Sequence, residues 1–86
     1  MRVGLIQPRS GAVLSGMATI TASVSGQPER VELYVDGQWQ GATNSPPYAF
    51  EWASQAVSNG RHRVVVTAIG ADGRQATSGV TVTIRN

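Results

Sequence analysis

The sequence contains no cysteine and no lysine, and each absence excludes a class of protein. Without cysteine the chain has no disulfide, no thiolate metal site and no cysteine nucleophile. All seven basic residues are arginines, and they are scattered along 86 residues that carry a net charge of +2. Nucleic-acid-binding proteins concentrate positive charge on one face, because their affinity grows with the number of phosphates that they neutralise. We therefore expect no nucleic-acid partner.

Long apolar runs are also missing from the chain. No segment approaches the roughly 18–20 apolar residues that a membrane-spanning helix requires, so we expect no insertion into a membrane. A basic segment followed by an apolar segment, as in a signal peptide, is not present either. Met1 is followed almost at once by a strand-like stretch, and we interpret the chain as a domain taken from a longer protein. Its length suits one hydrophobic core, which predicts a single domain over residues 1–86.

The apolar residues that are present recur with a period of two. No stretch shows the i, i+3, i+4 spacing that indicates a helix over about 11 residues. Alternating segments are separated instead by glycine, proline, asparagine and serine. We predict seven strands, over residues 3–7, 17–25, 31–35, 39–43, 48–52, 61–69 and 79–84. Short strands at this spacing predict an all-β sandwich or barrel.

Two pairs of turn residues separate predicted strands. Asp36-Gly37 lies between two alternating segments, and such a pair favours a hairpin whose two central residues both take positive φ. Asn59-Gly60 gives a second turn signal directly before the longest β-branched stretch. The strands on either side of Asp36-Gly37 are therefore predicted to pair with each other.

Several short motifs occur in a fixed order, namely VELYVDG at 31–37, Gly41, PYAFEW at 47–52, NGRH at 59–62 and VTA at 66–68. The opening segment PRSGAVLSG at 8–16 has the form of a first strand with a kink. Together these residues, spread over nearly the whole chain, resemble the bacterial immunoglobulin-like domain. Copies of that domain lie beside catalytic domains in secreted polysaccharide-degrading enzymes and in bacterial surface proteins. The resemblance implies an immunoglobulin-like antiparallel β-sandwich of about seven strands.

The same resemblance implies a function and a setting. It suggests a non-catalytic structural spacer or accessory module of a larger secreted or cell-surface protein, with neighbouring domains of that polypeptide as partners. It implies neither catalytic residues nor a cofactor, and it places the chain outside the cell or at its surface. One position departs from the family. Where the family commonly has an aspartate that caps a turn or helps to bind a cation, this chain has Gly70, followed by Asp72.

His62 is the only histidine, and we weigh a catalytic or metal-binding role against a structural one. A general base needs a partner within reach, and a metal site needs two or three further ligands. None of the acids has motif spacing to His62; they are Glu29, Glu32, Asp36, Glu51 and Asp72. We expect the ring to point inward and to bond a backbone carbonyl at a corner of the sandwich. Asp36 and Asp72 are interpreted as turn residues, so we expect no metal site.

The aromatic residues are the best candidates for ligand binding, because tryptophan and tyrosine are enriched at interfaces. Phe50 and Trp52 share the inward phase of their segment, which predicts core positions. Tyr34 is out of phase with its apolar neighbours, and Trp39 lies in a segment with few other apolar groups. An aromatic platform of Tyr34 and Trp39, with arginines supplying polar contacts, would make the chain a carbohydrate-binding or adhesion module, which is the alternative function. Uncovered strand edges are compatible with a monomer or a weak dimer.

Overall fold

The computed structural model describes all 86 residues and is built almost entirely of strands. The strands are β1 (Arg2–Gln7), β2 (Val13–Leu14), β3 (Met17–Ser25), β4 (Arg30–Val35), β5 (Gln38–Thr43), β6 (Tyr48–Ala53), β7 (Gly60–Ile69) and β8 (Gln75–Ile84). A single turn of 3₁₀ helix, η1 (Ser54–Ala56), follows β6. No helix is long and apolar enough to span a bilayer. All seven predicted strands are present, and β2 is an additional one.

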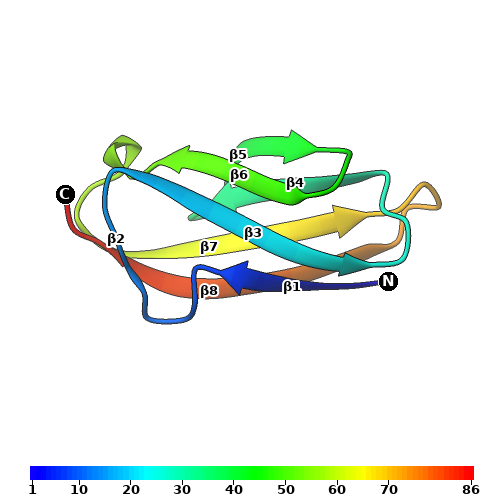
Figure 1. The fold of residues 1–86 in the computed structure, drawn as a ribbon, viewed down its shortest axis with the longest axis horizontal. Helices are drawn as coiled ribbons and strands as arrows, with labels where there is room; N and C mark the ends of the chain where they lie inside the picture. The colour runs from blue at the N-terminus through cyan, green and yellow to red at the C-terminus, as the bar shows by residue number, and fades with distance from the viewer.

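The strands form two sheets that stack face to face (Figure 1). The three-stranded sheet has the order β1-β3-β6, and the five-stranded sheet has the order β2-β8-β7-β4-β5. Every neighbouring pair is antiparallel except β2 and β8, which run parallel. This division of strands between two layers is that of an immunoglobulin-like sandwich. The predicted fold class is confirmed.

Two features of the five-stranded sheet were not predicted. Strand β2 has only two residues, which is too short for an alternating pattern, and it pairs with Thr83 and Ile84 at the end of β8. Strand β8 begins at Gln75, four residues before its predicted start. Residues 75–78 are small or polar, so apolar alternation gives no sign of them. Pairing with β7, from Ile69 opposite Gln75 onward, holds this segment in the sheet.

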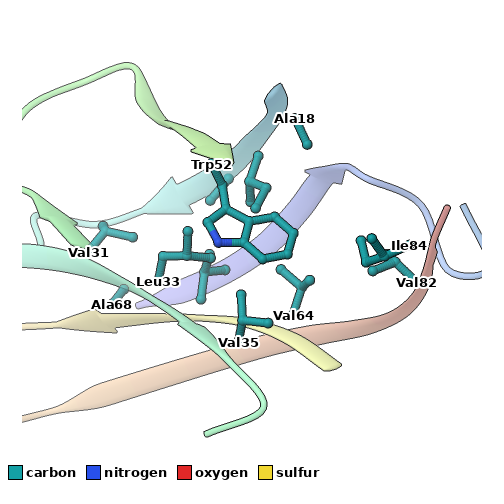
Figure 2. Close-up of a cluster of buried hydrophobic side chains, with 12 residues drawn as sticks. Ala18, Val31, Leu33, Val35, Trp52, Val64, Ala68, Val82 and Ile84 are labelled. Carbon is teal, nitrogen blue, oxygen red and sulfur yellow. The ribbon is translucent and has the colours of Figure 1, made fainter. Parts of the chain in front are cut away.

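The hydrophobic core lies between the two sheets and consists of twelve buried residues. Figure 2 shows the indole of Trp52, from β6, projecting toward Leu33, Val35 and Val64 of the opposite sheet. Ile20 of β3, a partner of Phe50 in the sheet, has no exposed surface. The inward faces therefore follow the two-residue period read from the sequence.

The two ends of the chain lie at opposite ends of the molecule. The principal extents are 39 × 21 × 19 Å, and the strands run roughly along the longest of these axes (Figure 1). The N-terminus is at one end of that axis, and the C-terminus is at the other. The polypeptide therefore enters and leaves the sandwich at opposite poles.

Candidate functional site

The two aromatic residues singled out in the sequence are neighbours in the five-stranded sheet. Tyr34 of β4 is the register partner of Trp39 of β5. The register shifts between Leu33 and Tyr34, because Leu33 pairs with Gly41 and the bulge leaves Gln40 unpaired. Side chains of directly opposed residues lie on the same face of a sheet. Tyr34 and Trp39 therefore lie side by side.

These two rings lie on the outer face of the sandwich. Leu33 and Val35, on either side of Tyr34, are each 2% exposed and point into the core. Tyr34 is half-buried and faces outward, as its phase predicted. Trp39 is 59% exposed, the largest exposed aromatic group of the chain. The structure thus brings together the pair of rings that the sequence analysis proposed as a platform.

The row continues across the sheet beyond the two aromatic residues. Tyr34 also pairs with Val65 of β7, and Val65 pairs with Gly79 of β8. A Cβ atom placed on Gly79 would lie 3.0 Å from both Arg63 Nη2 and Val65 Cγ2. The Arg63 guanidinium therefore lies over Gly79, in the space that a side chain there would need. One outward-facing row thus crosses β5, β4, β7 and β8, and it consists of Trp39, Tyr34, Val65 and Gly79. The row ends beside the Arg63 guanidinium.

Val65, Arg63 and Gly79 were not predicted to lie beside the two aromatic residues. Val65 is out of phase with Val64 and Val66, so alternation puts it on the opposite face, but nothing local shows which residues lie beside it. The position of Gly79 opposite Val65 follows from the pairing of β7 with β8, which no local pattern indicates. The only available signal was the phase of Arg63 and Val65 relative to buried Val64.

Hydrogen bonds fix the ring of Tyr34 on this face. Its hydroxyl donates to Glu32 Oε1 at 3.1 Å, and Glu32 Oε2 accepts from Arg30 Nε at 3.4 Å. The bond to the Glu32 carboxylate raises the pKa of Tyr34, because only the protonated hydroxyl can donate it. Tyr34 is thus a neutral hydrogen-bond donor, and its aromatic face remains available on the sheet.

His62, at the start of β7, is held by two acceptors. Its Nδ1 lies 2.5 Å from Asp36 Oδ2, and its Nε2 lies 2.7 Å from the carbonyl oxygen of Ser58. The second contact confirms the predicted bond to a backbone carbonyl. A carbonyl and a carboxylate only accept hydrogen bonds, so both contacts are satisfied together when the ring is protonated and both of its nitrogens donate. Both bonds raise the pKa of His62, and the bond to Asp36 has the larger effect.

Asp36 is the partner of His62 that the sequence analysis did not identify. Its Oδ1 accepts from the backbone N–H of Arg63 at 2.9 Å, and this bond, followed by that from His62, lowers the pKa of Asp36. Asp36 also takes a φ of +53° in the hairpin turn, as expected of a turn residue. Asp36 and His62 are 26 residues apart, and they meet because β4 pairs with β7. Because each ring nitrogen lies beside an acceptor, the pair ties the hairpin to β7.

The turn between β7 and β8 is closed by Asp72. Its Oδ1 accepts from the backbone N–H of Arg74 at 3.1 Å, and its Oδ2 lies 3.1 Å from Arg74 Nε. A Cβ atom on Gly70 would lie 2.9 Å from Asp72 Oδ1, so the glycine leaves room for that carboxylate. The turn-capping role missing at position 70 is therefore performed by Asp72, as its interpretation as a turn residue predicted.

Other surface features lie away from the aromatic row. An open hollow at one end of β4 and β5 is lined by Glu29, Arg30, Ala42, Thr43 and Asn44. A second lies beside the N-terminus and the turn after β7, where it is bounded by Gly26, Gly70 and Asp72. The structure brings no three histidine, cysteine, aspartate or glutamate side chains into one cluster.

Comparisons with known proteins agree with this architecture. The fibronectin(III)-like modules of Clostridium thermocellum CbhA match with 29% identity and a TM-score of 0.82, over 96% of this chain and 95% of theirs. The endo-β-1,4-mannanase from Thermotoga petrophila matches with 14% identity and a TM-score of 0.83, which shows a shared fold. That match covers 99% of this chain but 20% of the mannanase. Curated proteins give no match.

A family model identifies the chain more directly. The model described as the bacterial Ig domain matches residues 2–66, which span β1 to the middle of β7. This stretch includes most of the motifs that suggested the resemblance, among them the β4–β5 hairpin and the aromatic segment of β6. The chain therefore belongs to the bacterial immunoglobulin-like domain family.

Proposed function

We propose that the chain is a non-catalytic structural spacer or accessory module of a larger secreted or cell-surface bacterial protein. The observation that carries this proposal is the position of the termini at opposite ends of a body 39 Å long. A module connected in this way separates its two neighbours by its own length. The partners are the neighbouring domains of the same polypeptide.

The C-terminal end of the sandwich supports a stiff connection. The backbone N–H of Asn86 donates to Asn59 Oδ1 at 2.9 Å, and Asn59 Nδ2 donates to the carbonyl oxygen of Asn86 at 3.3 Å. The side-chain oxygen of Asn86 accepts from the backbone N–H of Gly16 at 2.8 Å and from Ser54 Oγ at 3.2 Å. Three separate segments thus hold Asn86 and fix the direction in which the chain points.

The comparisons also favour a place beside catalytic domains. In the mannanase the matching region is a fifth of a longer enzyme chain, and the CbhA structures are described as modules. We propose the same kind of setting for the present chain, as a module of a polysaccharide-degrading enzyme or of a surface protein, outside the cell.

The spacer role is tested in the full-length parent protein, by comparing the intact module with a deletion and with a Gly/Ser linker of equal residue number. Small-angle X-ray scattering should show that the deletion shortens the maximum dimension by close to the 39 Å length of the module. The flexible linker should broaden the distribution of distances, because such chains behave as random coils. An unchanged maximum dimension in the deletion variant contradicts the spacer role.

A second candidate function is carbohydrate binding or adhesion through Tyr34 and Trp39. The observation that favours it is the register pairing of the two rings on the outer face, with Trp39 59% exposed. Affinity electrophoresis on soluble and insoluble polysaccharides should show retardation that Trp39→Ala removes. Met17→Ala is the matched control, because Met17 is 61% exposed but lies in the other sheet. Retardation that survives Trp39→Ala, or none with any polysaccharide, rejects this candidate.

A further inference from the structure

We propose that the outer face of the five-stranded sheet binds an acidic polysaccharide, whose carboxylates pair with Arg61 and Arg63 while its sugar rings lie along Trp39, Tyr34 and Val65. The inference rests on the second candidate function, carbohydrate binding at Tyr34 and Trp39. It adds the charge of the ligand and the residues that recognise that charge.

Arg61 and Arg63 share the outer face with the aromatic row. His62, which lies between the two arginines in β7, and Val64, which follows them, both point inward. The side chains of Arg61 and Arg63 therefore point outward. Both arginines are exposed, and their register partners on β8 are threonines. Neither forms an ion pair with a carboxylate of the chain. Two guanidinium groups are therefore available to a ligand on this face.

The carboxylates of the same sheet do not neutralise these arginines. Glu32 is paired with Arg30 and bonded to Tyr34, and Asp36 is paired with His62. The three remaining carboxylates lie on β6 and in the loops that precede β4 and β8. The charge of Arg61 and Arg63 is thus uncompensated, which favours a negatively charged partner.

The guanidinium of Arg63 lies next to the row that contains the two aromatic rings. It lies over Gly79, beside Val65, which pairs with Tyr34. A guanidinium donates two parallel hydrogen bonds to a carboxylate, and tryptophan and tyrosine offer an apolar face with a polar group at its edge. A carboxylated sugar ring presents an apolar face and an anion together. Its apolar face matches the rings of Trp39 and Tyr34, and its carboxylate matches the guanidinium of Arg63.

A nucleic acid would also offer anions and flat rings. Its affinity for proteins comes mainly from neutralising many phosphates, however, and a loss of positive charge weakens binding in proportion. Arg61 and Arg63 are only two cations beside the row of rings. Two arginines beside a long uncharged row therefore favour a sugar polymer, in which each arginine can pair with one carboxylate, over a nucleic acid.

Isothermal titration calorimetry tests the proposal with three soluble ligands of six units each: hexagalacturonate, cellohexaose and hexathymidylate. We expect hexagalacturonate to bind most tightly, with an affinity that falls as salt is added. Arg63→Gln should weaken this binding about tenfold, as the loss of a charged hydrogen bond does. Trp39→Ala should weaken the binding of the sugar as well.

Arg2→Gln is the matched control, because it removes one positive charge from an exposed residue of β1 in the other sheet. It should change the affinity less than about twofold, since screening weakens the effect of distant exposed charges. Arg63→Gln keeps the backbone N–H that Asp36 accepts, so its fold should be intact, and a thermal melt checks this. Equal losses in the two variants would reduce the effect to net charge and reject the site.

The remaining outcomes separate this inference from the functions on which it builds. Equal binding of hexagalacturonate and cellohexaose, unchanged in Arg63→Gln, rejects the acidic ligand but leaves carbohydrate binding standing. Binding of neither sugar rejects both and leaves the spacer role untouched. Tighter binding of hexathymidylate overturns the inference in favour of a nucleic-acid partner.

Discussion

Trp52 fills the middle of the core but leaves one polar group without a partner. The residue is 5% exposed, and its Nε1 is buried with no hydrogen-bond acceptor. An unpaired buried donor costs about 1–3 kcal/mol, which offsets part of what the ring contributes by packing. Removing the ring and removing only its N–H should therefore have very different effects on stability.

We expect Trp52→Ala to lower the free energy of unfolding by about 3–5 kcal/mol, as large-to-small core substitutions do. Trp52→Phe should lower it by less than about 2 kcal/mol, because it keeps most of the apolar volume and eliminates the unpaired N–H. Urea denaturation measures both. Trp39→Ala, at an exposed position, should change the value by at most about 0.5 kcal/mol. Equal losses for the alanine and phenylalanine variants would show that the indole nitrogen has a partner.

The pair of His62 and Asp36 makes stability depend on pH in a defined direction. The folded protein raises the pKa of His62 above 6.5, so its contribution is complete below that value and is lost as pH rises through the raised pKa. The folded protein lowers the pKa of Asp36 below 3.8, so its contribution is present above that value and is lost as pH falls through the lowered pKa. The two contributions are therefore largest together between pH 3.8 and 6.5.

We expect the thermal midpoint of the parent to fall as pH rises above 6.5, through the raised pKa of His62. His62→Gln should lack this decline while retaining the loss at low pH. Differential scanning calorimetry across the pH range measures both profiles. A decline of the same size in His62→Gln would assign it to another group.

At the scale of the strand and the turn, the β4–β5 hairpin depends on backbone conformation. Asp36 and Gly37 have φ values of +53° and +81°, which are the two positive angles that a type I′ turn requires. A Cβ atom on Gly37 meets nothing within 4 Å, so any cost of adding one comes from the backbone itself. Glycine adopts this region freely, whereas other residues are strained there.

Gly37→Ala should therefore lower the free energy of unfolding by about 1–2 kcal/mol. Gly4→Ala in β1 is the matched control, because its Cβ also meets nothing within 4 Å and its φ is not positive. This control should leave stability within about 0.5 kcal/mol of the parent. Chemical denaturation of the two variants checks the difference, and similar values would show that the turn bears no strain.

Strands with strict alternation were predicted from the sequence, and those without it were not. Strand β3, from Met17 to Ser25, was predicted to the residue because apolar and hydroxyl side chains alternate from Ala18 to its end. The start of β8 and the whole of β2 depend on pairing with neighbours that are distant in the chain. The same distinction applies to the site. The phase of Tyr34 was visible in the sequence, whereas the contact of Arg63 with Gly79 required the register of β7 and β8.

For the molecule as a whole, the open edges of the two sheets bear on its association. Strand β5 ends the five-stranded sheet, and it carries a bulge at Gln40. A bulge makes an edge strand a poor template for pairing with another chain. We expect sedimentation equilibrium at micromolar concentration to give the monomer mass of 9.0 kDa. A stable dimer at that concentration would show that an edge or the exposed row associates with a second copy.

The separation of the termini also determines how the sandwich bears tension. Strand β1 leads inward from the N-terminal pole, and β8 leads out to the opposite pole (Figure 1). A pull on both ends acts along these strands, and antiparallel ladder bonds are perpendicular to the strands. The bonds between β1 and β3 are therefore sheared together rather than opened one after another. A chain of such modules would resist extension until a whole strand slides free.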